Sequence, residues 1–157
     1  MPPGVGSASL LAGPPPALAS GGVLPAFAMA IRSAPSSAEV VRCVMRAWIR
    51  CHCRPLENRV DDLLVVVSEL CTNAILYGRH DSFGVRCWMA TPDELRLEVH
   101  DGTPTAIPQP LHVGPESESG RGLLLVDILV TELGGAWGFT EDGTCAWCSL
   151  ALAGAEQ

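Results

Sequence analysis

The sequence lacks any apolar run of the roughly 18 residues that a membrane-spanning helix needs, because proline, glycine or charge interrupts every apolar stretch. Basic residues are also scarce. Ten Lys and Arg stand against 17 Asp and Glu, which gives a net charge of −7 and argues against a nucleic-acid-binding protein. The first basic residue is Arg32, so the N-terminus does not start like a secretory signal. We therefore expect a soluble, cytoplasmic protein without a membrane partner, whose acidic surface suits a basic protein partner.

Cysteine is plentiful, but its number argues against a disulfide framework, since seven is odd and the chain is expected to be cytoplasmic. Cys51-His52-Cys53 and the pair Cys145 and Cys148 contain the residue types that bind zinc. A strand sends residues three positions apart to opposite faces, so Cys145 and Cys148 would diverge. Cys51 and Cys53 are too closely spaced for the usual zinc-binding turn. Most cysteines are therefore interpreted as small apolar residues, and a zinc-binding structural protein is kept as a remote alternative.

The length of 157 residues allows one compact domain and is too short for two. Residues 1–22 are dominated by Pro, Gly, Ala and Ser, without charge or periodicity, and such a composition cannot bury a core of its own. We expect a flexible tail over 1–22, a folded domain over 23–152 and a short tail over 153–157. The stretch Ala26–Ile31 fits an edge strand.

Helical periodicity covers the two segments that follow. Ser36 and Glu39 have the spacing of a capping box, so a first helix is predicted to begin there and to end near Cys51–Arg54. A second helix is predicted from Leu56 to Leu76, with Gly78 stopping it. Spacings of three and four mark the buried face of each helix. The predicted buried positions are Val40, Val41, Val44, Met45, Trp48 and Ile49 in the first helix and Leu56, Val60, Leu63, Val67, Leu70 and Ala74 in the second.

The pattern then changes to alternation, which predicts strands over 83–89 and 95–99 joined by a turn at Thr91-Pro92-Asp93. Apolar residues, Phe83 among them, point to one side of the first strand, while Arg86 and Trp88 point to the other. The two strands are therefore predicted to form an antiparallel hairpin with one side facing the core.

Residues 101–121 contain four prolines and three glycines with almost no periodicity, which is typical of a functional or disordered loop. A third helix is predicted over 122–133. A last hairpin joins 136–140 to 144–150 through Asp142-Gly143, a favoured tight turn. The predicted fold is α+β, a two-layer sandwich in which a mostly antiparallel sheet carries helices on one face.

Three groups of polar residues could carry chemistry. Glu69 and Asn73 lie four positions apart on the second helix and share a face. Taken alone, this pair fits a solvated helix face best, but a carboxylate and an amide placed in this way can also hold a hydrated Mg²⁺ or orient a hydroxyl. Asp101 ends a strand, where a carboxylate can accept a ligand's hydrogen bond or simply form a turn. Ser119-Gly120-Arg121-Gly122 precedes a helix, whose N-terminus favours anions, and Arg121 could contact phosphate or face water.

The histidines show no pattern of base and nucleophile and are given no catalytic role. Tyr77 and the four tryptophans are spread over separate elements without interleaved basic residues, so we interpret them as core or sheet-face residues.

In this order and spacing, the three groups resemble the ATP-binding boxes of the superfamily that contains gyrase, the ninety-kilodalton heat-shock protein, histidine kinases and mismatch-repair ATPases. Ser68–Gly78 resembles the first box of the small anti-sigma factor serine kinases, and Gly120–Val126 resembles the box after their ATP lid. Trp137-Gly138 before a hairpin also fits this family. The resemblance spans about residues 36–151 and implies a Bergerat-type ATP-binding fold.

The resemblance implies a role for each residue. Glu69 would be the general base and Asn73 would bind Mg²⁺. Asp101 would accept a hydrogen bond from the adenine amino group of ATP, and Gly120 and Gly122 would carry the lid against the phosphates. The implied activity is that of a serine/threonine protein kinase, with a sigma factor and an anti-sigma antagonist as partners. Since related kinases often dimerise, a homodimer is a candidate state.

Two positions depart from the family pattern. Thr103 and Thr105 stand where the second box usually has glycines, and Tyr77 stands where these kinases often have histidine. A stiff lid, with Pro104 between the threonines, motivates an alternative function: a non-catalytic partner-binding module on the same fold, with weak or lost nucleotide binding.

Overall fold

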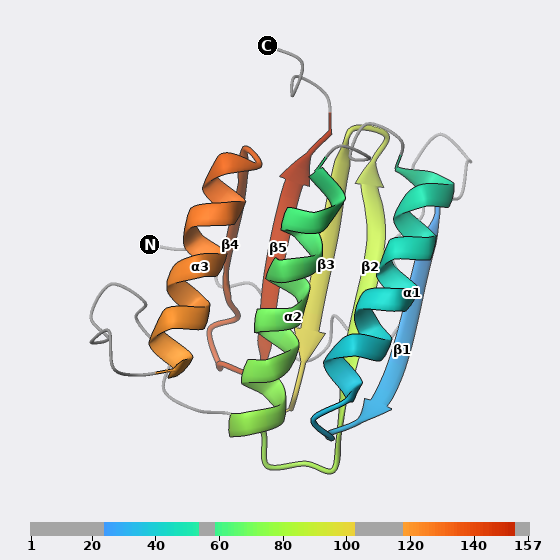
Figure 1. Cartoon of the computed structure of the whole chain (residues 1–157). Coiled ribbons are helices and arrows are strands. Elements are labelled where there is room, and N and C mark those ends of the chain that lie inside the picture. Colours follow the sequence, from blue (N-terminus) through green and yellow to red (C-terminus); the bar gives the residue numbers. More distant parts are fainter. Residues whose placement is uncertain (1–23, 54–58, 103–117, 153–157) are drawn as a thin grey trace.

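The computed structural model describes residues 24–53, 59–102 and 118–152. The predicted tails over 1–22 and 153–157, the loop over 103–117 and Leu56 of the predicted second helix lie outside the described residues. The predicted order of elements is confirmed. The elements are β1 (Ala26–Arg32), α1 (Ser37–His52), α2 (Val60–Tyr77), β2 (Ser82–Thr91), β3 (Glu94–His100), α3 (Glu118–Glu132), β4 (Gly135–Phe139) and β5 (Cys145–Ala151) (Figure 1).

The strands form one five-stranded sheet in the order β1-β2-β3-β5-β4, and every neighbouring pair is antiparallel. The three helices lie side by side on one face of this sheet, with α2 between α1 and α3 (Figure 1). The predicted α+β two-layer sandwich is therefore confirmed. Within the described ranges, no helix is both long and apolar enough to cross a membrane.

The first helix buries a narrower stripe than predicted. Met45 and Ile49 are fully buried, and Trp48 packs edge-on against Phe27 of β1 with ring centroids 5.5 Å apart. Val40 and Val44 are 46% and 37% exposed, so the prediction that they face the core was wrong. One helix face packed against a sheet edge does not shield positions at the margin of its apolar stripe.

The predicted capping box does not form. Ser36 occupies the N-cap position but makes no side-chain cap hydrogen bond. Ser37 instead donates its hydroxyl hydrogen bond to the carbonyl oxygen of Arg32, at 2.5 Å, and so ties the start of α1 to the end of β1. The tertiary contact with the strand replaces the local cap that the sequence favoured.

The second helix is buried on two sides. The predicted positions Leu63, Val67 and Leu70 are buried, and so are Leu64 and Val66, which the periodicity left out. Flanking helices on both sides of α2 and the sheet below explain this, since a central helix exposes only a narrow outer strip.

The third helix starts earlier than predicted. It begins at Glu118 rather than at 122, so Gly120, Arg121 and Gly122 lie inside its first turns and not in a loop before it. The two glycines predicted a turn here, because glycine is unfavourable within a helix. From Gly122 onward the helix lies against α2, where Gly122 faces the Glu69 side chain.

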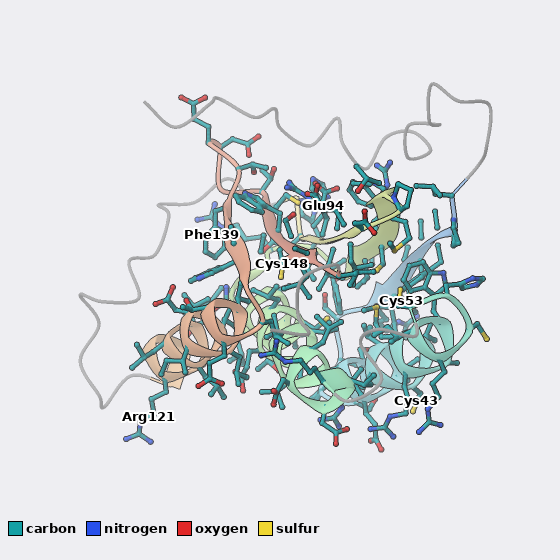
Figure 2. All side chains as sticks on the ribbon, turned by 90° about the horizontal axis from the view of Figure 1, so that it is seen from above. Cys43, Cys53, Glu94, Arg121, Phe139 and Cys148 are labelled. Atoms are coloured by element: carbon teal, nitrogen blue, oxygen red, sulfur yellow. The ribbon has the colours of Figure 1, made fainter. Side chains whose placement is uncertain are left out.

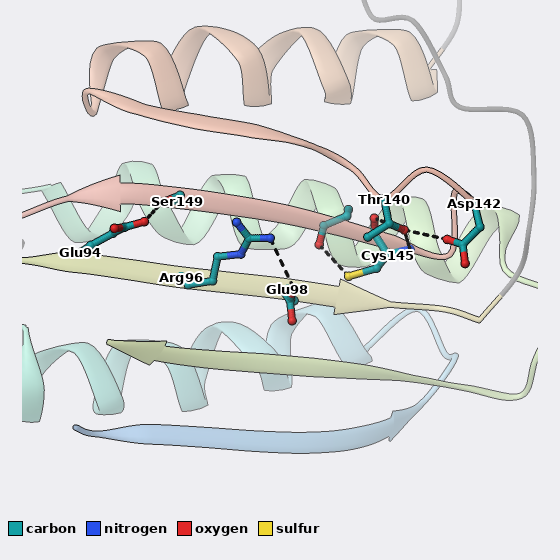
Figure 3. Close-up of polar contacts among 8 residues, drawn as sticks. Glu94, Arg96, Glu98, Thr140, Asp142, Cys145 and Ser149 are labelled. Carbon is teal, nitrogen blue, oxygen red and sulfur yellow. Dashed lines mark hydrogen bonds and ion pairs between the residues drawn. The ribbon is translucent and has the colours of Figure 1, made fainter. Parts of the chain in front are cut away.

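The last hairpin is confirmed and its turn is strongly hydrogen-bonded (Figure 3). One carboxylate oxygen of Asp142 accepts hydrogen bonds from the hydroxyl of Thr140 at 2.8 Å and from the hydroxyl of Thr144 at 2.8 Å. Gly143 takes a positive φ of 75°, a conformation that suits glycine. The backbone N–H of Thr144 also donates to this oxygen, at 3.1 Å, and this bond, followed by those of the Thr144 and Thr140 hydroxyls, holds the pKa of Asp142 below its ordinary value.

The hairpin of β2 and β3 differs from prediction in one respect. Phe83 lies in the core as expected, but Arg86 and Trp88 on the opposite side are also buried, at 3% and 7% exposure. The helix-free face of the sheet is therefore not a solvated surface at these positions.

Candidate functional site

A small pocket lies between the C-terminal half of α2 and the start of α3. Its volume is about 210 Å³. Glu69 and Asn73 both line it, so the face they share on α2 is directed at a cavity rather than only at solvent. The full lining is Glu69, Thr72, Asn73, Leu76, Tyr77, Gly122 and Leu123.

Gly122 of α3 lies against Glu69 of α2 at this pocket. A Cβ atom built on it would lie 2.5 Å from Oε2 of Glu69, which is closer than real Cβ contacts. With glycine at this position, α3 can approach the Glu69 carboxylate without displacing it. The structure therefore brings together three of the predicted site residues: Glu69, Asn73 and Gly122.

Asp101 lies beside the end of α2. It follows β3, and its backbone N–H donates to the carbonyl oxygen of Thr144 at 3.1 Å. A Cβ atom on Gly78 would lie 3.2 Å from the Cβ of Asp101, so the first and second predicted boxes are adjacent in space. Asp101 is half-buried and is not among the residues that line the pocket itself.

The first turns of α3 carry the remaining predicted residues. Arg121 is exposed and projects outward from the start of the helix (Figure 2). Gly120 lies one residue before it in the same turn. The N-terminal end of α3, a helix of 15 residues, carries the positive end of the helix dipole, which favours an anion near the pocket.

Sequence reasoning missed part of this site. Tyr77, interpreted as a core or sheet-face residue, is 51% exposed and lines the pocket, so that interpretation was wrong. Leu76 and Leu123 were not singled out, although both line the pocket. Leu76 is 56% exposed. The signal in the sequence was the pair of apolar residues Leu76 and Tyr77 directly before Gly78, at the end of the helix, where neighbouring elements often leave side chains uncovered.

Two histidines stand next to the second predicted box. His80 lies against Gly102, where a Cβ atom would meet the imidazole ring at 3.4 Å. Burial lowers the pKa of His100, while the neighbouring Asp101 and Asp142 carboxylates oppose that shift. Gly102 itself has a φ of 70° and so can turn the chain away from β3 beside these rings.

The zinc alternative gains no support from the part of the chain that the structure describes, which contains no group of three or more metal-ligating residues. Cys148 lies in the hydrophobic core, and Cys145 points to the other side of β5, as the spacing predicted. Cys53 is buried beside Met89, while Cys51 is exposed. Burial raises the pKa of the Cys148 thiol to about 12, which disfavours the thiolate that a zinc ligand must be.

Residues 31–149 match the protein family described as the histidine kinase-like ATPase domain. Since this match covers well over half of the 157 residues, the chain belongs to that family. None of the curated proteins matches the chain. Membership confirms the superfamily that the three groups of polar residues resembled, and it suggests that the domain binds ATP. The assignment to the anti-sigma kinase family within this superfamily stays a prediction.

The residues at the pocket fit this ligand class. Carboxylate and amide oxygens, as on Glu69 and Asn73, are donors that Mg²⁺ prefers. Gly122 lies in the early turns of a helix whose N-terminus suits phosphate. The cavity of about 210 Å³ is smaller than the roughly 300–1,000 Å³ of ordinary ligand pockets, so these seven residues enclose only part of a nucleotide.

Proposed function

We propose that the chain binds ATP with Mg²⁺ and acts as a serine/threonine protein kinase on an anti-sigma antagonist, and that it controls transcription by partner switching with a sigma factor. The observation that carries the nucleotide site is the convergence of Glu69, Asn73 and Gly122 on one pocket. The kinase activity and the two protein partners rest on the resemblance of Ser68–Gly78 and Gly120–Val126 to the anti-sigma factor kinases.

The proposed chemistry uses a few groups. Glu69 would accept the proton of a serine hydroxyl while that oxygen forms its bond to the γ-phosphorus of ATP, and the bond from this phosphorus to the bridging oxygen would break, which releases ADP. Asn73 supplies an oxygen to Mg²⁺, and the start of α3 stabilises phosphate charge. Asp101 accepts a hydrogen bond from the adenine amino group. Bound ATP and Mg²⁺ supply the phosphoryl group and neutralise its charge, and positioning accounts for most such catalysis.

The first test is calorimetric titration of the protein with ATP in the presence and absence of Mg²⁺. We expect Asp101→Asn to weaken binding by roughly 10- to 100-fold, because a hydrogen bond to a charged group contributes about 1.5–3 kcal/mol. Asn73→Ala should leave an affinity that no longer depends on Mg²⁺. Ser68→Ala is the matched control, since the Ser68 hydroxyl bonds the carbonyl of Leu64 within α2 and the residue does not line the pocket. A folded wild-type protein without ATP binding would overturn the proposal.

The second test concerns catalysis. We expect transfer of labelled phosphate from ATP to a serine of an anti-sigma antagonist protein, and its loss in Glu69→Gln with ATP binding retained. Binding of ATP without any transfer would refute the kinase activity while keeping the nucleotide site.

A non-catalytic binding module is the second candidate. The observation that favours it is Tyr77, which lines the pocket at a position where the kinases that the sequence resembles often have histidine. This candidate predicts that a sigma factor or another protein partner binds equally well to wild type and to Asn73→Ala, without ATP.

A further inference from the structure

The strand β1 forms one edge of the sheet. Among the described strands it pairs with β2 alone, in a continuous register (Figure 1). The edge of a sheet presents unpaired backbone N–H and C=O groups, and proteins usually protect it with charged side chains, proline or a bulge. From Ala26 to Ile31 the strand contains only alanine and large apolar residues, and its one charge is on its last residue, Arg32. Its outer side is therefore suited to pairing with a further strand.

The hydrogen bonds to β2 determine which backbone groups of β1 face outward. Ser33 donates its N–H to the carbonyl oxygen of Asp81 at 2.7 Å, and Met89 donates its N–H to that of Pro25 at 3.1 Å. Alternate residues make such bonds in an antiparallel pair, so the odd-numbered residues of β1 bond β2. The residues that direct their N–H and C=O groups to the outer side are Ala26, Ala28, Ala30 and Arg32.

An uncharged flank of α1 lies beside this edge. Helix α1 lies over β1 and β2, with Trp48 packed on Phe27 (Figure 1). On the side that faces α2, the helix carries charged residues such as Arg46, whose guanidinium lies 3.9 Å from Asp61 of α2. The opposite flank repeats at helical spacing and is exposed, although the protein has a net charge of −7 and ample charge for its surface. This flank consists of Val40, Val44, Ala47 and Cys51.

Two contacts fix the level of α1 along β1. Trp48 packs on Phe27, and the Ser37 hydroxyl donates to the carbonyl oxygen of Arg32. Between these contacts the strand rises by about 16 Å, and the helix also rises by about 16 Å. The two elements therefore run side by side in opposite directions. The middle of β1, about 7 Å from Phe27, lies level with Val44, about four residues before Trp48 in the helix.

We propose that two copies of this chain pair through β1, antiparallel about a two-fold axis at Met29, and form one continuous sheet in which the two α1 helices meet at Val44. A two-fold interface must be complementary to itself, and this edge is. About this axis Ala28 lies opposite Ala30 of the second copy. Both residues direct their N–H and C=O groups outward, so they bond each other in both directions.

The side chains of the edge also match. On the helix side, Phe27 lies opposite Ile31 of the second copy, and both are only partly buried in one chain, so pairing completes their burial. Arg32 lies opposite Ala26 of the second copy, so no like charges meet.

The helices fit the same axis. Since α1 lies over β1 and β2, each helix would lie about one strand spacing from the axis, which places the two helices about 10 Å apart, a normal packing distance. Val44 then meets Val44 of the second copy, and Val40 meets Ala47. The pocket beside Glu69 lies between α2 and α3, with α2 separating it from α1, so pairing leaves both pockets accessible (Figure 1). The dimer therefore does not depend on nucleotide binding.

The test measures the mass of the full chain by sedimentation velocity for wild type, Val44→Asp, Val44→Lys and an equal mixture of the two variants. We expect wild type to sediment with twice the mass of one chain. Each variant alone should dimerise at least about 100-fold more weakly, because two like charges meet at the axis. The mixture should form dimers again, because opposite charges then meet there. Only a surface that faces its own copy gives this pattern.

Ile128→Asp is the matched control, since Ile128 is an exposed apolar residue of α3, at 47% exposure, and this variant should remain dimeric. The proposal is overturned if wild type sediments as a monomer at about 100 µM, where even a dimer with a micromolar Kd would form. It is equally overturned if Val44→Asp dimerises as well as wild type, or if the mixture stays monomeric.

Amide hydrogen exchange followed by NMR tests the strand pairing separately. The outward N–H groups of Ala28 and Ala30 should exchange on the order of tenfold or more slowly in wild type than in Val44→Asp, because pairing protects them. The N–H of Met29 faces β2 and should be protected in both proteins. A wild-type dimer in which Ala28 and Ala30 exchange as fast as in the variant would have its interface elsewhere and would contradict the proposal.

Discussion

At the scale of single residues, two glycines control how the elements of the pocket approach one another. A Cβ atom at Gly122 would meet the far end of the flexible Glu69 side chain, whereas one at Gly78 would meet the backbone carbonyl oxygen of Ala74. A carboxylate at the end of a side chain can move, and a backbone carbonyl in a helix cannot. The same substitution at the two glycines should therefore act on different properties of the protein.

We expect Gly122→Ala to displace the Glu69 carboxylate while changing the free energy of unfolding by no more than about 1 kcal/mol, since alanine also favours the helix. Phosphotransfer should fall on the order of 10²-fold, because a positioned general base contributes at least that much. Gly78→Ala should lower the free energy of unfolding by about 1–3 kcal/mol through overpacking. Urea unfolding measures the effect of each variant on stability, and phosphotransfer assays measure its effect on activity. If both variants lower the free energy of unfolding equally, the Glu69 side chain has no room to move and the prediction is wrong.

The residues of the site were predictable where local spacing determines their relation. Glu69 and Asn73 lie four apart on one helix, and that spacing places them on one face whatever surrounds the helix. The contact of Gly122 with Glu69 was not predictable from spacing, because it depends on how closely α3 packs against α2. Tyr77 was misjudged for the same reason: exposure at the end of α2 depends on what packs there.

At the scale of elements, α3 is connected to the edge of the sheet by a hydrogen bond between side chains. The indole Nε1–H of Trp137 in β4 donates to a carboxylate oxygen of Asp127 in α3, at 2.9 Å. At its other end, α3 accepts a hydrogen bond at the carbonyl oxygen of Glu132 from the Arg59 guanidinium, next to the start of α2. The helix that carries Gly122 is thus attached to both of its neighbours.

We expect a double-mutant cycle of Asp127→Ala and Trp137→Phe to give a coupling free energy of about 0.5–1.5 kcal/mol, the net contribution of one such hydrogen bond. Thr131→Ala combined with Trp137→Phe is the control, because the Thr131 hydroxyl bonds the backbone carbonyl of Asp127 and not the indole. Urea unfolding of all single and double variants gives both values. Coupling in the control pair as large as in the test pair would contradict the assignment to the Asp127 carboxylate.

Element boundaries show which forces the sequence reveals. The turn at Asp142-Gly143 was predicted correctly, because turn chemistry is local. The start of α1 and the start of α3 were not. Ser37 uses its hydroxyl for Arg32 rather than for a helix cap, and α3 extends back to Glu118 despite two glycines. In both cases contacts with another element outweigh a local preference worth about 1 kcal/mol.

At the scale of the whole molecule, stability should depend on pH through the centre of the helix-free face. Burial raises the pKa of Glu98 above its ordinary value of 4.5, against the opposing charges of Arg96 and Arg86. Between the ordinary and the raised pKa, the folded protein therefore binds more protons at this group than the unfolded chain does. The contribution of Glu98 to the free energy of unfolding is highest at low pH and falls as pH rises through the raised pKa.

We expect the free energy of unfolding of wild type minus that of Glu98→Gln to decrease from about pH 4 upward and to become constant above the folded pKa. Urea titrations over a pH series measure it, with Glu141→Gln at an exposed turn position as the matched control. His100, whose pKa is lowered by burial, contributes the opposite slope in both proteins and cancels from the difference. A difference that rises with pH would contradict the assigned direction.

The class of the whole fold followed from the order of helical and alternating segments, which requires one sheet covered by helices. The burial of Arg86 and Glu98 could not be predicted in the same way, because alternation only indicates that their side chains point to the face of the sheet opposite the core.

The position of β1 in the sheet has a consequence for the order of events in folding. Ala26 pairs with Trp88 and Arg32 with Ser82, so two whole helices separate the partners along the chain. The hairpins β2–β3 and β4–β5 close over short turns, whereas β1 must await the docking of α1 and α2, since closing a long loop is entropically unfavourable until other contacts compensate for it. Until then the outer edge of β2 is unpaired, and it is there that a newly made chain is most exposed to association with another copy of itself.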